Sequence, residues 1–544
     1  MKKTFLAISA LAAVLFAGCT SSDELTTLES VKNADNTPTP VQFGTYMGKT
    51  GTRSTGGVTG DITTTTLQTG THSASGFGII AYTTGNTAWS SWKGTSGHVP
   101  NFMYNQKVTY STDHWTYTPV KFWPNDFAVG NVDNSEGTDE DGSAQGSVAG
   151  GKVSFFAYAP WVDVLSYTTP STTTKYNSVE NSAIEVSDGA GTPAAVTDGI
   201  VALTSNQYID EPKVKYVLSN ASLGSAVDLL WGIREQGTTY NLANNTTDDQ
   251  ASAADIYNTD LTKQKAGETI DFLFKHALAK LGGHTYETSA QTGLQVILDL
   301  DNGSLNGGTT NGTAITGGVK EAKTLVTVSS ITIQDLATAT SSVTASNLVT
   351  TGWFNLATGT WSEITGTGAT YSHIVNNSSS GTFAMNDQIK EPTSTTGITC
   401  NGTAWTSDGS TTITGVTTAV QDVYTSDSNA PGLVLIPAST AQTLRVTVTY
   451  IVRTYDTNLA ASSNDDGAAG GTWTKVTQTI TNDVVIPANS LQSNKFYKLL
   501  IHLGLTSVKF SATVAAWGEA ASQNDNDGTD SDKLIWLPSN TVTP

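Results

Sequence analysis

The chain has 544 residues, a formal net charge of −20, 38% hydrophobic residues and only 14% charged residues. This length is enough for about two or three domains, each with a core of its own. Low charge combined with abundant Thr, Ser and Gly is typical of short strands and turns, and it excludes a helical bundle. The acidic balance argues against nucleic-acid binding and against adsorption to anionic lipid headgroups, because phosphate groups would repel such a chain.

The N-terminal segment predicts export and lipidation. The apolar run Phe5–Phe16 is too short for a good bilayer-spanning helix and is typical of a signal peptide. The sequence FAGC that ends at Cys19 resembles a lipobox, in which a diacylglycerol is joined to the cysteine thiol before cleavage. We therefore expect a signal peptide over residues 1–18 and a lipid on Cys19, so that the rest of the chain works outside the cytoplasm. The alternative is an ordinary secretory signal whose cysteine is incidental.

Cys19 and Cys400 are the two cysteines of the chain. Lipidation of the first would leave one thiol and no intrachain disulfide, so stability must come from buried area and strand pairing. Cys400 is expected to be a small buried or turn-adjacent residue rather than a reactive one.

The first predicted strand is Val41–Met47, which follows a polar tether over residues 20–39. Val41, Phe43 and Met47 share one face of this strand. A Gly/Thr-rich loop with an isolated basic residue, Arg53, comes next. Further strands of the first half are predicted at Gly76–Tyr82, Phe102–Tyr110, Val153–Pro160 and Val227–Trp231.

A stretch without periodicity, Gly237–Gly267, is the predicted boundary between two domains, 54–260 and 261–532. Thr269–Leu281 alternates like a strand in its first part and is the best short-helix candidate in its second part. Strands of the second half are predicted at Leu294–Leu300, Thr324–Ile333, Leu433–Ile436, Leu444–Tyr455, Trp473–Ile486, Tyr497–Leu503 and Val508–Trp517. The Thr/Gly/Ser-rich stretches, above all Ser341–Gly432, are expected to be loops. The pattern predicts an all-β protein of two antiparallel β-sandwiches with long loop insertions and one short helix.

The sequence shows no constellation of catalytic residues. His276 and His284 lie eight residues apart around the predicted helix. No second pair of histidines at metal-ligand spacing accompanies them, so a zinc site is not expected. No nucleophile elbow, phosphate loop or dinucleotide-binding fingerprint occurs in a fitting context. We therefore expect no cofactor, no metal and no enzymatic activity.

A cation site is a weaker alternative near the C-terminus. Asp525, Asp527, Asp530 and Asp532 alternate with small residues and partly resemble a calcium loop. The terminal Glu of such a loop is missing, because Leu534 lies at its position.

The tryptophans divide into two groups. Trp123, Trp231 and Trp517 lie in or beside predicted strands and are expected to anchor cores. Trp89 and Trp92 lie in a predicted loop and are the candidates for a sticky, glycan-binding surface.

Seven short motifs occur in a characteristic order. They are Lys121–Pro124 (KFWP), Val153–Pro160 (VSFFAYAP), Val227–Trp231 (VDLLW), Phe272–Leu281 (FLFKHALAKL), Leu433–Pro437 (LVLIP), Asn494–Leu499 (NKFYKL) and Val514–Trp517 (VAAW). Together with the lipoprotein signal, this order resembles the Bacteroidia-type fimbrillins, also called type V pilins. The resemblance covers residues 41–544 apart from the long loops.

The resemblance implies two transthyretin-like β-sandwich domains and export as a lipoprotein. It implies that an arginine-specific surface protease removes the lipidated N-terminal piece together with the first strand. It also implies that a C-terminal strand from the next subunit fills the groove that the lost strand leaves in the N-terminal domain.

The residues near the N-terminus fit this scheme. Cleavage between Arg53 and Ser54 would remove Cys19 together with Val41–Met47, so residues 19–53 would be a lipidated propeptide. Refilling the groove would bury about three to five large side chains at ~1.5–3 kcal/mol each. Such a head-to-tail contact is heterologous and gives an open filament. The alternative is that Arg53 is only a solvated loop charge.

The C-terminus provides a candidate donor. An acidic spacer precedes residues 533–544, the predicted donor segment. Its apolar anchors alternate, with Leu534 and Trp536 on one face and Ile535 and Leu537 on the other. The alternative is a last strand that folds back on its own sandwich.

The leading hypothesis is therefore a structural subunit of a cell-surface fimbria that supports adhesion or biofilm formation. Its expected partners are identical or homologous subunits, an arginine-specific surface protease, and the outer membrane through the lipid of the precursor, with no nucleic acid. One alternative is a fimbrial tip or anchor subunit that keeps its lipid. Another is a surface glycan-binding lipoprotein that uses Trp89 and Trp92.

Overall fold

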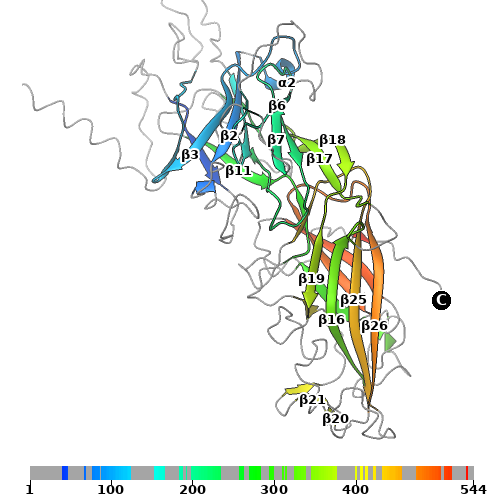
Figure 1. Ribbon diagram of the computed structural model, residues 1–544. Helices are drawn as coiled ribbons and strands as arrows, with labels where there is room; N and C mark the ends of the chain where they lie inside the picture. The colour runs from blue at the N-terminus through cyan, green and yellow to red at the C-terminus, as the bar shows by residue number, and fades with distance from the viewer. Residues whose placement is uncertain are drawn as a thin grey trace, which may run out of the picture.

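The computed structural model of the protein describes residues 40–46, 67–68, 76–85, 87–123, 152–165, 183–187, 192, 198–234, 257–261, 269–283, 293–298, 309–310, 313–314, 324–338, 345–376, 399–400, 405–407, 411–413, 421–423, 432–455, 473–503, 508–516 and 535–536. The molecule is elongated (Figure 1). Strands β2, β3 and β11 lie at one end, the long strands β16, β25 and β26 lie at the other, and β17 and β18 lie between them.

The first sheet is centred on β5, which pairs with β2 on one side and with β9 and β10 on the other. The strand order is β1-β11-β9-β5-β2-β3-β4. Its strands are β1 (Phe43–Tyr46), β2 (Phe77–Gly85), β3 (Met103–Ser111), β4 (His114–Thr116), β5 (Lys152–Ala159), β9 (Leu230–Ile233), β10 (Asn258–Leu261) and β11 (Ile270–His276). Nearly every residue of β5 is buried, as expected of a strand that is covered on both faces.

Each face of this sheet belongs to a different core. Phe155 points to one face and packs in a cluster with Phe77 and Phe272, which we call the N-terminal cluster. Phe156 and Tyr158 point to the other face and belong to a larger core that continues through the second sheet into the C-terminal half. The period of two along a strand produces this division, because successive side chains point to opposite faces.

The second sheet has the order β18-β17-β8-β7-β6. Its strands are β6 (Ala183–Glu185), β7 (Gly199–Thr204), β8 (Lys213–Val217), β17 (Val349–Asn355) and β18 (Thr360–Thr367). The predicted loop Ser341–Gly432 is therefore wrong in part, because β17 and β18 form an antiparallel hairpin within it. The pairing of β17 with β8 places Phe354 opposite Val214, and both side chains are fully buried.

The C-terminal sandwich has a seven-stranded sheet with the order β23-β13-β27-β12-β24, extended by β28 on β27 and by β29 on β28. Its strands are β12 (Ala279–Leu281), β13 (Leu294–Leu298), β23 (Gln421–Asp422), β24 (Leu433–Leu435), β27 (Lys495–Leu503), β28 (Val508–Ala516) and β29 (Ile535–Trp536). Short hairpins lie outside the main sheets: β14 (Thr309–Thr310) with β15 (Thr313–Ala314), and β20 (Thr399–Cys400) with β21 (Trp405–Ser407) and β22 (Thr411–Ile413).

The facing sheet of this sandwich has four strands in the order β19-β16-β25-β26. They are β16 (Thr324–Asp335), β19 (Ser372–Asn376), β25 (Gln442–Tyr455) and β26 (Trp473–Ile486). Val446 and Val448 of β25 are fully buried, whereas Thr447 between them faces outward, 3.0 Å from the Thr481 hydroxyl of β26. This alternation matches the strand pattern expected from the sequence.

The prediction of an all-β protein with β-sandwiches and one short helix is confirmed. Most strand pairs are antiparallel, as predicted. The pairs β1 with β11, β12 with β27 and β13 with β27 are parallel, which the strand pattern of the sequence did not indicate.

The predicted position of the helix is wrong. The residues expected to be helical, after the alternating part of Thr269–Leu281, complete β11 and form β12, and the one-turn helix α2 is at Trp89–Trp92 instead. The reason lies in the partners of Ala277. Its N–H donates to the Leu229 carbonyl at 2.7 Å, and its carbonyl accepts from Trp361 Nε1 at 2.8 Å. Long-range partners thus replace the bonds of a helical turn.

Strands from both sides of the predicted boundary at residue 260 share sheets. β11 follows the boundary but completes the first sheet, and β17 and β18 pair with β8 of the first half. The division into 54–260 and 261–532 thus stays a prediction about folding units, whereas hydrogen-bonded sheets extend across it. In the part of the chain that the structure describes, no helix is long and apolar enough to cross a membrane.

The contact between Phe354 and two tryptophans provides a test of the shared core. The Phe354 ring lies edge-on to Trp231 at 5.0 Å and to Trp361 at 5.1 Å. We expect Phe354→Ala to lower the free energy of unfolding by about 3–5 kcal/mol, because it removes a fully buried ring and leaves a cavity. Chemical denaturation followed by tryptophan fluorescence measures this, with Thr365→Ala on the exposed side of β18 as the control. Equal denaturation midpoints for Phe354→Ala and Thr365→Ala would contradict the placement of Phe354 in the shared core.

Candidate assembly site

Residues 40–46, which we call the leader segment, lie at the edge of the first sheet between β11 and the segment around Lys121. We call the space that they occupy the groove. β1 pairs in parallel with β11, with Phe43 opposite Ile270. The Ile270 N–H donates to the Gln42 carbonyl at 2.8 Å, and on the other side the Val41 N–H donates to the Lys121 carbonyl at 2.9 Å. The leader segment is thus bonded through its backbone to two parts of the chain that are far apart in sequence.

Tyr117 fixes the start of the leader segment. Its hydroxyl donates to the Val41 carbonyl at 2.8 Å and accepts from the Lys121 N–H at 3.2 Å. Burial raises the pKa of Tyr117 to about 12, while the hydrogen bond with the Lys121 backbone lowers it. The phenol therefore stays a neutral donor at all ordinary pH values, and it holds the strand in one register.

The leader segment contributes two apolar anchors to the N-terminal cluster. Val41 is 1% exposed and Phe43 is 3% exposed. The Phe43 ring centroid lies 5.3 Å from Tyr117, 5.8 Å from Phe155 and 6.1 Å from Phe272. Burial of such side chains contributes about 1.5–3 kcal/mol each. The leader segment is therefore part of the core and not a loose extension.

The opposite face of β1 is constrained at Gly44. A Cβ atom at Gly44 would lie 1.9 Å from Asp271 Oδ1, and that oxygen accepts from the Thr269 hydroxyl at 2.7 Å. Burial raises the pKa of the Asp271 carboxyl, and the bond from Thr269 opposes this rise. The close approach explains why this strand has glycine between Phe43 and Thr45.

Two exposed apolar side chains lie beside the groove. Val120 is 49% exposed and Phe122 is 42% exposed, and Phe122 forms an antiparallel bridge with Pro40 at the start of the leader segment. They belong to the same segment as the Lys121 carbonyl, so the entrance of the groove has an apolar rim.

Several predicted site residues lie outside the described residues. Cys19, Met47, Arg53 and Ser54 are among them, so lipidation and cleavage stay predictions. The aspartates of the predicted acidic spacer are also outside. Of the predicted first strand, the structure places Val41 and Phe43 in the N-terminal cluster.

At the C-terminus, Ile535 and Trp536 form β29, which pairs with β28 of the same chain. In this pairing Trp536 is opposite Ser511, and Ile535 is opposite Ala512. Leu534 and Leu537 lie outside the described residues, as do the side chains of β29. Within the predicted donor segment, the backbone of Ile535 and Trp536 thus pairs with an edge strand of its own C-terminal sandwich.

The prediction that Trp89 and Trp92 form an exposed surface is wrong. They are 6% and 7% exposed, and they stack on each other with ring centroids 5.8 Å apart. Trp89 also contacts Tyr82 at 4.7 Å and Phe156 at 4.9 Å. The one-turn helix α2 directs both rings into the core. The sequence predicted a loop here and therefore did not indicate this burial. Trp123 and Trp231 are buried, in agreement with their predicted role as core anchors.

His276 has a structural partner. Its Nδ1 lies 2.6 Å from Asp228 Oδ2, and both side chains are buried. His284 lies outside the described residues. Among the residues that the structure describes, no group of three or more His, Cys, Asp or Glu side chains is arranged to hold a metal ion.

Sequence reasoning missed the parts of the groove that hold the leader segment. Tyr117 and Asp271 carry no motif, and their roles follow from contacts between distant segments. The glycine after Phe43 was a usable signal, since glycine inside a strand marks a place where other atoms approach closely.

No family model matches the chain. The chain is 37% identical over 101 residues to fimbrium subunit Fim1C of Phocaeicola vulgatus, a match that covers 19% of this chain and 19% of that relative. A crystal structure of a fimbrial protein from Bacteroides vulgatus aligns with 88% of this chain and 99% of its own, at 17% identity and a TM-score of 0.44. The sequence match confirms the resemblance to fimbrial subunits, and it spans about a fifth of the relative's length.

The leader segment's contribution to stability is open to measurement. We expect Phe43→Ala to lower the free energy of unfolding of the full chain by about 3–5 kcal/mol, because it empties the site between Tyr117 and Phe272. Gln42→Ala, on the exposed face of the same segment, is the matched control. Urea denaturation of both variants checks this, and a Phe43→Ala midpoint equal to that of the control would show that the groove does not depend on its anchor.

Alkaline pH tests the Tyr117 contact. The folded-state pKa of about 12 lies above the ordinary value of 10, so the unfolded chain loses this proton first. Stability from this group is full below pH ~10 and falls as pH rises towards 12. We therefore expect the free energy of unfolding of Tyr117→Phe to fall less steeply than that of the wild type between these pH values. Denaturant titrations at pH ~10 and pH ~12 measure the fall for each protein. An equal fall for the wild type and Tyr117→Phe would contradict the prediction.

Proposed function

We propose that the protein is a structural subunit of a cell-surface fimbria, made as an exported lipoprotein precursor. The observation that carries the proposal is the leader segment, whose Val41 and Phe43 complete a core that the rest of the first sheet leaves open at its edge. The partial sequence match to a fimbrium subunit supports the same class of function.

Maturation would begin with cleavage between Arg53 and Ser54. The chain has four arginines. Arg234 lies in a β-bridge directly after β9, and Arg445 and Arg453 lie within β25, which is paired with β16 on one side and β26 on the other. A protease needs a free extended segment, so these three sites are less suited to cleavage than Arg53. Arg53 follows the leader segment and precedes β2. A cut there would separate the leader segment and Cys19 from the rest of the sheet, so the lipid would no longer anchor the subunit to the outer membrane.

Removal of the leader segment would leave β11 with an unpaired edge and the N-terminal cluster without two anchors. The occupant that replaces it has to run parallel to β11 and to place apolar side chains at alternate positions. The C-terminal segment of a neighbouring subunit, with Leu534 and Trp536 on one face, supplies that pattern. To donate this segment, the neighbour would release β29 from its own β28. Repetition of this contact gives an open filament that supports adhesion.

The test is assembly after controlled cleavage. An arginine-specific endoprotease is required instead of trypsin, because trypsin would also cut after Lys533 and remove the donor segment. We expect filaments in negative-stain images of the cleaved wild type. Arg53→Gln is expected to stay uncleaved at this site and monomeric. The double variant Leu534→Asp with Trp536→Asp is expected to be cleaved and folded but not to polymerise.

The matched control is Ser539→Asp with Thr541→Asp, which adds the same charge beyond the donor anchors. Filaments from the Leu534/Trp536 double variant would refute the donor assignment. Mass spectrometry of the surface protein gives an independent check: an N-terminus at Ser54 supports a filament subunit, whereas a retained acylated Cys19 supports an anchor subunit.

A further inference from the structure

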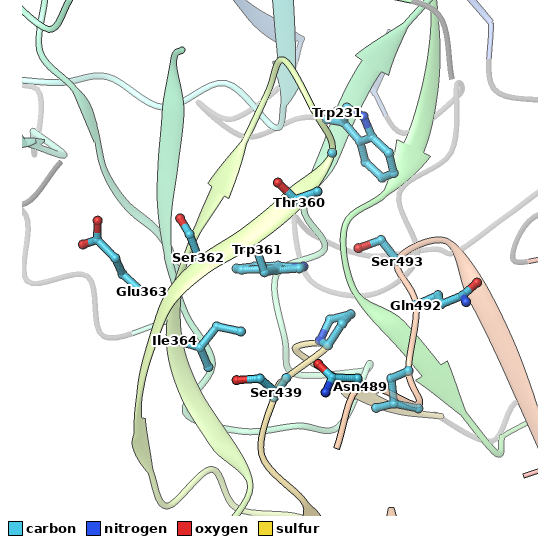
Figure 2. Close-up of a pocket in the computed structure, with 14 residues that line it drawn as sticks. Trp231, Thr360, Trp361, Ser362, Glu363, Ile364, Ser439, Asn489, Gln492 and Ser493 are labelled. Atoms are coloured by element: carbon cyan, nitrogen blue, oxygen red, sulfur yellow. The ribbon is translucent and has the colours of Figure 1, made fainter. Parts of the chain in front are cut away.

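A cavity of about 510 Å³ lies where the β17–β18 hairpin meets two loops of the C-terminal sandwich, residues 437–439 and 489–493 (Figure 2). This volume is within the range of pockets that bind small ligands. The cavity is far in sequence from the leader segment, and none of its lining residues takes part in the assembly site described above.

Trp361 presents a rigid aromatic ring to this cavity. Its Nε1–H donates to the Ala277 carbonyl at 2.8 Å, and its ring is held edge-on by Phe354 at 5.1 Å and by Tyr216 at 6.0 Å. Figure 2 shows Trp361 in the middle of the view, with Ser493 and Gln492 across the cavity from it. Because the indole is half-buried and fixed by its neighbours, it can bind a ligand face without losing side-chain freedom.

The polar groups around Trp361 are neutral except for one carboxylate. Hydroxyl and amide groups come from Thr360, Ser362, Ser439, Asn489, Gln492 and Ser493, and Glu363 adds the carboxylate. Hydrogen bonds from the backbone N–H groups hold the loops in place: the Asn489 N–H donates to the Ala438 carbonyl at 2.9 Å, and the Gln492 N–H donates to the Tyr497 side-chain hydroxyl at 2.8 Å. The amide side chains of Asn489 and Gln492 make no hydrogen bond within the described part of the chain, so they are available to a ligand.

We propose that this cavity binds an uncharged pyranose unit of a carbohydrate. The C–H groups of one pyranose face carry partial positive charge and pack on the negative face of an indole ring, here Trp361. The hydroxyl groups around the sugar ring both donate and accept hydrogen bonds, as do the amides of Asn489 and Gln492 and the hydroxyl of Ser439.

The composition of the pocket disfavours other ligand classes. No lysine or arginine is among the described residues that line it, so an anionic ligand would find no counter-charge there and would be repelled by an acidic protein. A purely apolar ligand would leave the amide groups of Asn489 and Gln492 without partners, which costs binding free energy. The site differs from the assembly groove, so sugar binding is independent of whether the subunit polymerises.

The experiment uses the full chain with cellobiose and N,N′-diacetylchitobiose as neutral probes and a glucuronic acid disaccharide as the acidic counterpart. Saturation-transfer NMR and tryptophan fluorescence titration measure binding. We expect saturable binding of at least one neutral disaccharide, with transfer to the protons of one ring face, and weaker or no binding of the acidic one.

Two variants locate the site. Trp361→Leu is expected to abolish transfer to the ring face. Because this change also touches the core, the second variant is Asn489→Gly with Gln492→Ala, which removes both amides from the rim while glycine retains the positive φ of residue 489. We expect it to weaken binding about three- to tenfold per lost hydrogen bond, with an unchanged unfolding midpoint. Gln207→Ala, an exposed glutamine outside the cavity, is the matched control.

The proposal is overturned if neither neutral disaccharide shows saturable binding to the wild type. It is also overturned if the Asn489/Gln492 variant binds as tightly as the Gln207→Ala control, or if the acidic disaccharide binds more tightly than both neutral ones. Filament formation after cleavage is read separately, so failure of sugar binding leaves the assembly proposal to its own test.

Discussion

The rest of the structure depends on one contact, in which the leader segment covers the β11 edge of the first sheet. β11 and the segment around Lys121 both use the leader segment as a backbone partner, and Phe43 fills the space between Tyr117, Phe155 and Phe272. Two buried anchors at about 1.5–3 kcal/mol each are a large fraction of the stability of an ordinary domain, which is about 5–15 kcal/mol. A chain that loses this segment therefore has a strong physical reason to accept another strand in its place.

The parallel pairing of β1 with β11 sets the direction of any replacement strand, and the contact between Gly44 and Asp271 restricts its side chains. A donor without glycine at that position would have to displace the Asp271 carboxylate from the Thr269 hydroxyl. The groove is thus better suited to the chain's own leader than to a donor. This difference in fit supports the proposal that cleavage removes the leader segment before a donor strand enters.

The two halves of the molecule are joined by more than a linker. Phe354 of β17 contacts Trp231 of the first sheet, and β17 pairs with β8 of the first half. Gln442 of β25 then joins β17 to the C-terminal sandwich, because it accepts a bond from the Val349 N–H while its own amide donates to the Ile436 carbonyl. Buried polar groups that are satisfied on both sides fix a unique arrangement. The cavity beside Trp361 is built from both halves, so its shape depends on this joint.

The sequence by itself determined the class of the fold and the long strands, because regular alternation in stretches such as Leu444–Tyr450 reflects burial of one face of a sheet. It also predicted that Val41 and Phe43 share one face. It could not determine that Phe272–Leu281 forms two strands joined by a bend at Ala277 and Leu278 instead of ending in a helix, since the partners of Ala277 are distant residues. It missed β17 and β18, because their Thr- and Gly-rich sequences are typical of loops. Their strand structure depends on the pairing of β17 with the distant strand β8. Only the tertiary structure decided which segments meet, because strand pairing and the groove around the leader segment arise from contacts that no local pattern encodes.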